Sequence, residues 1–401
     1  MFLSYTIVIR KVYQNCAKKF FIFLKLVFFA FKYNYYFLKI MDIQYNILDL
    51  FCGCGGLSKG FKDKGFTILG GIDNDEQALK SFLFNFPESR VYNCDISKTS
   101  PQKALYNLDI IPEQIDVLIG GPPCQGFSKI NNTNSGSEKD ERNELVYSFL
   151  NYVEFIHPAI VLIENVPELF YHKNGKTRRN IIKKLQDNNY NVSSQIISMY
   201  DYGLPQKRRR YFILAALNEK LIIPEGSSVR RSAWDAISDL PVVNQGEGTD
   251  GALYQIKPQN AFQRKMRKNS AGVFNHFGHK LSEKQTERIK IIKPGETLNE
   301  ADNNSKYSGV YGRLDYINPA PTVTASAHHI GAGRYIHPRE DRVLTVRELA
   351  RLQSFPDDFR FFGTRIQQTR QVGNAVPPMF AEYLASIIKK YLRKYKESMI
   401  I

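Results

Sequence analysis

One unit recurs between Met41 and about Ala216: a short apolar run, a turn that often contains glycine, and a helical pattern. The apolar runs are rich in β-branched and aromatic residues, and they lie at Tyr45–Phe51, Ile68–Ile72, Ile115–Ile119, Ala159–Ile163 and Tyr211–Leu214. Helical patterns lie between them, at Gln77–Phe84, Asn143–Ile156 and Thr177–Asn188. Continuously apolar strands that alternate with helices are typical of a parallel sheet covered on both faces. The sequence therefore predicts an α/β fold with a doubly wound, mostly parallel sheet.

The regular pattern weakens after this part of the chain, where Gly, Asn, Ser and basic residues become more frequent. This change predicts a second, smaller domain with irregular structure. Regular patterns return later: Thr345 and Glu348 form a capping box, and Pro377-Pro378 precedes a last amphipathic helix. The expected parts are an extension, a main domain, an irregular domain, a return to the main domain and a tail, at 1–40, 41–216, 217–340, 341–395 and 396–401.

The composition narrows the classes of partner. The 401 residues contain 55 Lys and Arg against 39 Asp and Glu, and the net charge of +16 favours nucleic acid or an anionic membrane surface. Hydrophobic residues make up 43% of the chain, enough for a sizeable core, so wholesale disorder is excluded. Five cysteines in a chain of this length do not form a disulfide framework, and we expect a reducing cytosol.

Residues 1–40 differ from the rest of the chain. They contain seven Lys or Arg, no Asp or Glu, and thirteen Phe or Tyr, without helix caps or turn residues. Their apolar run Phe20–Phe31 is interrupted by Lys25 and is shorter than the roughly 20 residues of a membrane span. It also lacks the small-residue cleavage site of a secretory signal. We expect a dispensable extension with Met41 as the start of translation; the alternative is a weak amphipathic patch that touches a membrane or DNA phosphates.

A glycine-rich turn, Asp49–Leu57, follows the first expected strand. Glycines let the backbone approach a ligand closely, and the following helix N-terminus favours an anionic group. Ser58 stands where the dinucleotide-binding fingerprint has a glycine, so that pattern fails. Asp73 ends the next strand and suits ribose hydroxyls, and Asp95 follows a further short strand between Ile72 and Ile115, the third in chain order. The turn and the acids predict an adenosine-containing cofactor, against a purely structural glycine turn.

No metal site is expected. Cys52 and Cys54 lack the Cys-x2-Cys spacing and the second cysteine pair of a tetrahedral zinc site. Five histidines fall in the irregular domain without cysteine or carboxylate partners at ligand spacing: His276, His279, His328, His329 and His337. We expect them to be surface or polar-contact residues.

A second motif, GGPPCQGFS at Gly120–Ser128, directly follows another apolar strand. Its two prolines fix the backbone just before Cys124, at the carboxyl end of a strand, where doubly wound folds place their ligands. The polar stretch Lys129–Arg142 follows, and its composition predicts a mobile loop. A cysteine on a rigid turn, rather than inside an apolar run, favours a nucleophile over a structural cysteine.

Polar residues also mark the ends of two later strands. Glu164 ends an apolar strand, where a carboxylate is costly unless it is functional or paired. Arg208 and Arg210 precede another strand. A basic run is often a solvated turn, but alternate positions share one face if the strand begins there.

Together these motifs resemble the cytosine-5 DNA methyltransferases of bacterial restriction–modification systems. The resemblance extends from Ile47 to about Leu392, with the motifs in the family's usual order. It includes the C-terminal segments Arg347–Pro356 and Gln371–Pro378. It is thin in the irregular domain, the part that varies within the family. The resemblance implies a Rossmann-like methyltransferase fold, in which the main domain is catalytic and the irregular domain recognises the target.

The implied reaction transfers a methyl group from S-adenosylmethionine to C5 of a cytosine flipped out of duplex DNA. The thiolate of Cys124 would add to C6 and activate C5, and it could leave again afterwards. Glu164 would hold N3 and the exocyclic amine. Arg208 and Arg210 would position the base, Glu164 and a nearby phosphate.

The resemblance also implies ligand contacts. Phe51 would pack on the adenine, Asp73 would take the ribose hydroxyls and Asp95 the adenine amine. Asn74 stands where many relatives have an apolar or aromatic residue. The rest of the cofactor pocket would be Gly53, Gly55, Leu57, Pro122 and Asn374. The candidate DNA contacts are Gln125, Ser128, Arg264, Lys265, Arg313 and Thr322. For Arg264 and Lys265, which belong to a basic run, the alternative is simple solvated surface.

The expected setting is the bacterial cytoplasm, at the nucleoid, without a membrane. We expect a monomer that is paired in function with a restriction endonuclease. Two alternatives are a cytosine-5 RNA methyltransferase of the transfer-RNA type and a catalytically inactive DNA-binding relative. The long basic irregular domain argues against the first, and intact Cys124, Glu164, Arg208 and Arg210 argue against the second.

Overall fold

The computed structural model describes residues 44–123, 144–226, 229–302 and 311–400. Within these ranges, Tyr45–Lys389 form one compact unit, to which the features that bear on function belong. No helix among these residues is long and apolar enough to cross a membrane. The expectations for residues 1–40 concern a part of the chain outside the described ranges.

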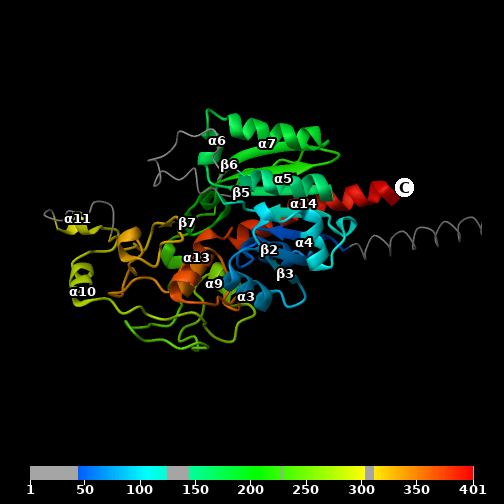
Figure 1. Cartoon of the computed structure of the whole chain (residues 1–401). Helices are drawn as coiled ribbons and strands as arrows, with labels where there is room; N and C mark the ends of the chain where they lie inside the picture. The colour runs from blue at the N-terminus through cyan, green and yellow to red at the C-terminus, as the bar shows by residue number, and fades with distance from the viewer. Residues whose placement is uncertain (1–43, 124–143, 227–228, 303–310, 401) are drawn as a thin grey trace, which may run out of the picture. The chain divides into compact units, whose positions relative to one another are not determined.

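A seven-stranded sheet lies at the centre of the described unit (Figure 1). Its order is β3-β2-β1-β4-β5-β8-β6, and the strands from β3 to β5 run parallel. β8 is antiparallel to both β5 and β6. The strands are β1 (Asn46–Leu50), β2 (Thr67–Asp73), β3 (Arg90–Asn93), β4 (Val117–Gly120), β5 (Ile160–Asn165), β6 (Asn191–Ser198) and β8 (Arg209–Ala216). The predicted doubly wound, mostly parallel sheet is confirmed.

The sequence pattern does not predict β6, which lies at the edge of the sheet. Its eight residues include three serines and an asparagine, and most of them are only half-buried. An edge strand is covered less completely than a central one, so it needs no continuous apolar run. The predicted strands are those whose residues are mostly buried, and β4 and β5 are buried throughout.

Helices cover both faces of the sheet. α4, α5 and α7 share an apolar core with every second residue of the strands, such as Leu48 and Val161. The alternate residues face the other helices: Phe212 of β8 contacts Phe380 of α14, with ring centroids 5.1 Å apart. The covering helices are α2 (Gly56–Lys62), α3 (Glu76–Asn85), α4 (Pro101–Leu108), α5 (Glu144–Ile156), α7 (Lys176–Asp187) and the part up to Lys389 of α14 (Pro378–Ile400).

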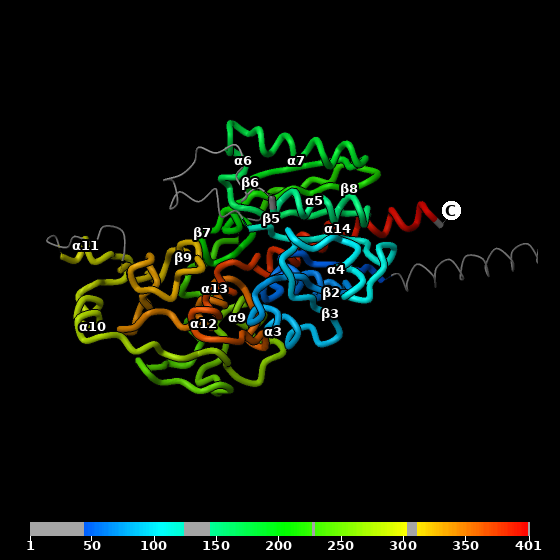
Figure 2. Tube along the Cα trace, in the orientation of Figure 1, coloured from blue at the N-terminus to red at the C-terminus, as the bar shows by residue number. Residues whose placement is uncertain are grey.

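Short helices joined by loops make up the described part of residues 217–340 (Figure 2). A small apolar core lies in the C-terminal part of this region and includes Ile289 and Ile336. The region is irregular, as predicted, but it does not separate from the sheet as a compact unit of its own. Its elements are α8 (Ala233–Ile237), α9 (Ala261–Arg267), α10 (Glu283–Lys290), α11 (Leu298–Ala301) and β9 (Ala320–Pro321). The later helices are α12 (Val346–Leu352) and α13 (Arg365–Asn374).

Buried arginines join the irregular region to α12 and the loop after it. Arg351 is fully buried and binds Asp357 through Nε and Nη2, at 2.5 and 2.6 Å, and Asp239 through Nη1, at 3.0 Å. Arg342 binds Glu348 through two hydrogen bonds of 2.8 and 2.7 Å. Interior ion pairs offset the cost of desolvation only with such bidentate geometry.

Candidate active site

The glycine-rich turn after β1 adopts backbone angles that few side chains tolerate. Phe51, Gly53 and Gly55 have φ values of 57°, 52° and 90°. A Cβ atom on Gly55 would lie 2.3 Å from the ring of Phe86, so only glycine fits at this position. The glycines therefore let the chain turn sharply from β1 into α2.

The carboxylate of Asp73 holds this turn against the end of β2. Its two oxygens accept hydrogen bonds from the backbone N–H groups of Gly53, at 2.8 Å, and Asp75, at 2.9 Å. Burial raises the pKa of Asp73, although these two N–H groups act in the opposite direction. Asp73 is thus a support of the turn as well as a candidate ligand group.

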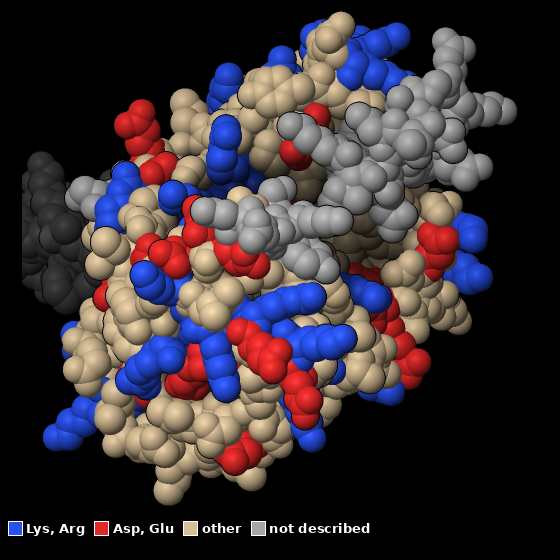
Figure 3. Space-filling model, turned by 90° about the vertical axis from the view of Figure 1, so that its left-hand side faces the viewer, with Lys and Arg blue, Asp and Glu red and all other residues tan. Residues whose placement is uncertain are grey.

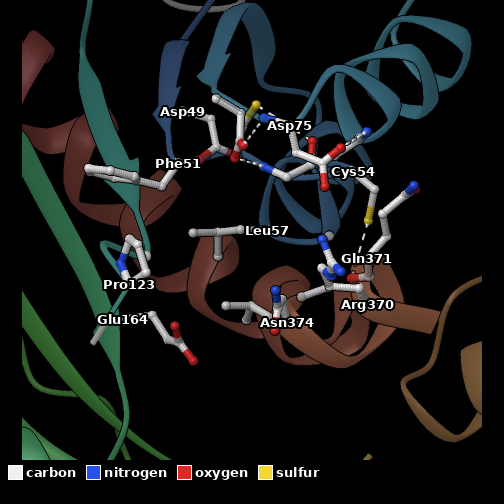
Figure 4. A pocket seen from close by; sticks show the side chains of 18 of the residues that line it. Asp49, Phe51, Cys54, Leu57, Asp75, Pro123, Glu164, Arg370, Gln371 and Asn374 are labelled. Atoms are coloured by element: carbon white, nitrogen blue, oxygen red, sulfur yellow. Dashed lines mark hydrogen bonds between the residues drawn. The ribbon is translucent and has the colours of Figure 1, made fainter. Parts of the chain in front are cut away.

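A cavity of about 820 Å³ opens where β1, β2, β4 and β5 end, and α13 closes another side (Figure 4). This is the carboxyl edge of the parallel strands, where such folds place their ligands. Glu164 and Asn374 lie at the lower side of the cavity in Figure 4, and Asp49 and Asp75 at the upper side. The predicted site residues that line it are Phe51, Gly53, Leu57, Asp73, Pro122, Glu164, Arg210 and Asn374.

Asp95 lines a smaller cavity of about 100 Å³, whose lining shares Phe51, Asp73, Asn74 and Pro123 with the lining of the large cavity. A hydrogen bond from the Ser97 hydroxyl, at 2.6 Å, lowers the pKa of Asp95. The smaller space therefore extends the larger one towards an ionised carboxylate. Gly55 lines neither cavity, so its part is limited to the shape of the turn.

Glu164 and Arg210 form an ion pair on the wall of the large cavity. Glu164 ends β5 and Arg210 is the second residue of β8, the antiparallel neighbour. The Arg210 Nε and Glu164 Oε1 atoms are 3.0 Å apart, and both side chains are largely buried. The pair explains how a carboxylate can end an apolar strand, because a buried charge needs a partner.

Asn165 is a site residue that the sequence analysis missed. Its Nδ2 atom donates to the carbonyl of Pro122 at 3.0 Å, and its Oδ1 accepts from the N–H of Val166 at 2.8 Å. The side chain is almost fully buried and lines the cavity. Asn165 thus fixes the turn after β4 to the end of β5. The signal in the sequence is its position directly after Glu164, in a buried strand.

Asp49 also lines the cavity and was given no role from the sequence. It is 1% exposed; its Oδ2 accepts from the Ser58 hydroxyl at 2.5 Å, and its Oδ1 has no hydrogen-bond partner among the described residues. Burial raises the pKa of Asp49 to about 7. This carboxyl group therefore offers an unused acceptor at the cavity. Other lining residues not predicted include Asp75, Arg370 and Gln371.

Arg208 does not lie at the cavity, which corrects the expectation that it shares a face with Arg210. β7 (Gln206–Lys207) ends before it and β8 begins after it, so the alternation of a strand does not apply at this break. Its side chain is fully buried, and Nη1 donates to the carbonyls of Val323 and Gly373, both at 3.1 Å. Burial, and then the neighbouring Arg210, lower the pKa of Arg208.

The candidate DNA contacts of the irregular region fall into two groups, one buried and one at the surface. Arg313 is 4% exposed and donates to the carbonyls of Ile289, Ile292, His337 and Glu340 and to the carboxylate of Asp341. This corrects the expectation for Arg313, because these bonds leave the guanidinium inside the irregular region.

The other candidates in the irregular region reach the surface. Arg264 is exposed, and Lys265 pairs with Glu382. The hydroxyl of Thr322 donates to the carbonyl of Lys207 at 2.8 Å. On the face in Figure 3, Lys and Arg side chains are interspersed with Asp and Glu. That face therefore shows no large patch of a single charge sign.

The nucleophile predicted from the sequence lies outside the described ranges. Pro122 and Pro123 line the cavity and precede it directly. Cys124, Gln125 and Ser128 fall within 124–143 and have no structural account here. In the described ranges, no group of three or more His, Cys, Asp or Glu side chains is placed to hold a metal ion.

Known proteins resemble this chain over nearly all of the compact unit. Residues 45–390 match the family described as C-5 cytosine-specific DNA methylase. Type II methyltransferase M.DdeI of Desulfomicrobium norvegicum is 35% identical over 380 residues, which cover 86% of this chain and 89% of that protein. Type II methyltransferase M1.HphI of Haemophilus parahaemolyticus is 34% identical over 369 residues, 90% of each chain.

A solved structure agrees with these sequence matches. It is a prophage-encoded E. coli protein described as a DNA modification methyltransferase, and it superposes with a TM-score of 0.72 at 28% identity. The match covers 87% of this chain and 99% of that one. Since the family match spans both the sheet and the irregular region, the chain belongs to the C-5 cytosine-specific DNA methylase family and is a DNA (cytosine-5)-methyltransferase.

Proposed function

We propose that the large cavity binds S-adenosylmethionine beside a cytosine flipped out of duplex DNA, and that Cys124 activates this base through a covalent bond to C6. The main support is that the Glu164–Arg210 pair lines the same space as the glycine turn and Asp73. The Pro122–Pro123 turn on its wall leads directly to Cys124. Methyl transfer between two bound ligands requires this kind of shared space.

The lining residues fit S-adenosylmethionine by their chemistry. Asp49 offers a buried acceptor without a partner in the described ranges, which suits a cationic ammonium group. Asp73 lines both spaces and suits ribose hydroxyls. When bound, the cofactor supplies an electrophilic methyl group. The proposed contacts are Phe51, Gly53, Leu57, Asp73, Asp95, Pro122 and Asn374, with Gly55 shaping the turn.

Each catalytic side chain has a separate task. The Cys124 thiolate forms a bond to C6, and the ring electrons move to C5, which becomes nucleophilic. Glu164 accepts a hydrogen bond from the exocyclic amine and places a proton near N3. Arg210 orients Glu164, and Asn165 fixes the Pro122 carbonyl ahead of the nucleophile. After methylation the C5 proton leaves to water, and the C6–sulfur bond breaks to release Cys124.

We also propose that residues 217–340 recognise the target through base edges in the major groove. Arg264, Lys265 and Thr322 stay candidates for DNA contacts, together with Gln125 and Ser128. The enzyme would act as a monomer at the nucleoid, in the bacterial cytoplasm. The type II names of its relatives support a pairing with a restriction endonuclease, from which methylation would protect the host DNA.

Duplex DNA with 5-fluorocytosine in place of cytosine tests the covalent step, because fluorine cannot leave as a proton does. With S-adenosylmethionine, the wild-type protein should form a complex that survives denaturing electrophoresis. Cys124→Ala should form none and should still bind the DNA. Trapping that persists in Cys124→Ala would contradict the assignment of the nucleophile.

The role of Glu164 can be tested in the same assay. Glu164→Gln should lower turnover by about 100-fold or more, because the group that holds and protonates the base is changed. Glu154→Gln, an exposed carboxylate on α5, is the matched control and should keep normal turnover. Near-normal turnover in Glu164→Gln would remove Glu164 from the mechanism.

A further inference from the structure

One segment of the irregular region, Ala320–Ala325, lies between the start of β8 and the end of α13. β9, at its beginning, pairs in parallel with β7 (Figure 2). The Thr322 hydroxyl donates to the backbone of β7, at the Lys207 carbonyl. The segment is therefore attached on one side to the residues that precede Arg210 in the chain.

On its other side the segment makes a backbone-to-backbone contact with α13 at Gly373. A Cβ atom on Gly373 would lie 2.3 Å from the carbonyl carbon of Thr324 and 2.4 Å from the nitrogen of Ala325. Only glycine permits this approach. The next residue, Asn374, lines the large cavity. The position of the segment and the position of this cavity wall are thus connected.

Arg208 bridges the two sides. Its Nη1 atom donates to the carbonyl of Val323, in the segment, and to the carbonyl of Gly373, in α13, both at 3.1 Å. We call this contact between Ala320–Ala325 and α13 the joint. A second side chain strengthens it, because Gln206 accepts from the N–H of Val323 and donates to Gln353. One buried cation and its neighbour therefore join the irregular region to the cavity wall.

The joint is less fully bonded than the other interior arginine sites. Nε and Nη2 of Arg208 have no hydrogen-bond partner among the residues described, whereas all three nitrogens of Arg351 are bonded. A buried guanidinium with unused donors costs free energy. The packing around Arg208 is therefore less stable than the packing around Arg351, and a ligand that fixes either side would stabilise it.

We propose that Arg208 is a positioning residue that couples the two ligands of the enzyme: DNA bound by the irregular region and cofactor bound beside Asn374 each raise the affinity for the other. The inference rests on the proposed function, which places the cofactor in this cavity. DNA contacts at the Ala320–Ala325 segment and cofactor contacts at α13 favour the same packed joint. Such coupling is reciprocal, so it can be measured from either ligand.

The test is the equilibrium dissociation constant of S-adenosylhomocysteine, a non-reactive probe, measured with the full chain with and without saturating unmethylated amplified duplex DNA. In wild type, DNA should tighten probe binding about tenfold. In Arg208→Ala this ratio should fall to about one. Arg209→Ala removes the adjacent, exposed arginine and should keep the wild-type ratio. A purely structural role would weaken binding without changing the ratio.

Gly373→Ala gives an independent variant, because the added methyl group displaces the segment while Arg208 stays intact; the ratio should again fall to about one. If Arg208→Ala does not fold, Gly373→Ala and Arg208→Lys carry the test. An unchanged ratio in these variants, or a wild-type ratio of one, overturns the coupling. Failure of the wild-type protein to bind the probe at all would instead contradict the proposed cofactor site.

Discussion

The sheet region and the irregular region of this enzyme satisfy their backbone groups in different ways. In the sheet, neighbouring strands pair their N–H and C=O groups, and apolar side chains fill both faces. In the irregular region, loops leave carbonyls that no strand can pair, and arginine side chains donate to them. A guanidinium carries five donors, so one side chain can serve several carbonyls.

This difference affects how much of the chain's positive charge is available to bind DNA. Among the residues that the structure describes, five arginines are less than 5% exposed, and each donates inside the fold: Arg208, Arg313, Arg342, Arg347 and Arg351. A positive net charge therefore overstates the surface available to DNA. In this chain part of the excess of basic residues stabilises irregular backbone.

A graft should separate the two regions most strongly. If residues 217–340 from a relative replace those of this chain, with Asp239 and His276 retained for their bonds to Arg351 and Thr345, target choice should change completely. Cofactor affinity without DNA should stay close to wild type, since all of the proposed cofactor ligands lie outside the graft. Sequencing of methylated sites would report the change. An active chimera that keeps the original target would refute the division of labour.

Removing one interior arginine should cost more stability than removing a surface lysine. Arg351→Met leaves Asp239 and Asp357 buried without this partner, so the free energy of unfolding should fall by about 3–5 kcal/mol. Lys183→Met breaks only the exposed pair with Asp187 on α7 and should change it by less than about 1 kcal/mol. Urea unfolding of both variants measures the difference. Equal losses would mean that interior arginines do not hold the irregular region.

Acid should weaken the irregular region through His337. Burial lowers the pKa of His337 to about 3, and its Nδ1 accepts from the backbone N–H of Glu340 at 2.9 Å, as a neutral ring does. Below about pH 6.5, His337 binds a proton in the unfolded chain but stays neutral in the folded chain. Stability is therefore present above pH 6.5 and is lost as pH falls towards 3.

His337→Gln should remove about 2 kcal/mol of the stability loss between pH 6.5 and 4.5, as measured by urea unfolding at each pH. Some loss should persist because burial also lowers the pKa of His276. Although burial alone would raise it, the pKa of Glu348 is held low by Arg342, so this carboxylate matters only at lower pH. The same acid loss in His337→Gln and wild type would show that another group is responsible.

In the sheet region, the smallest effect should come from one hydrogen bond. Asn165→Ala removes the donor to the Pro122 carbonyl, so kcat should fall about tenfold, or about 1.4 kcal/mol, with unchanged cofactor affinity. Asn191→Ala removes a comparable donor to Leu217 at the exposed sheet edge and should leave kcat unchanged. Steady-state kinetics and probe binding measure both. A loss of affinity in place of kcat would show that Asn165 shapes the cofactor site instead.

The sheet could be predicted because buried parallel strands leave a continuous apolar pattern. β6 escaped this rule as a half-exposed edge strand. The direction of β8 was also not encoded in its apolar run, because pairing direction depends on the path of the chain between strands.

The site could be predicted only where a motif and a strand end coincide. This rule found Asp73, Pro122 and Glu164, which line the cavity. It missed Asn165, whose role depends on a contact with another strand end. Arg313 was expected among the DNA contacts from the family resemblance and is buried instead, because its burial results from loops far apart in the sequence.

The most direct test of the account is base analysis after incubation with S-adenosylmethionine carrying a labelled methyl group. Amplified duplex DNA and transfer RNA would be offered in separate reactions, with Cys124→Ala as the inactive control. The wild-type enzyme should place label in duplex DNA, released on hydrolysis as 5-methylcytosine, and Cys124→Ala should place none. Label found only in RNA, or recovered as N4-methylcytosine, would contradict it.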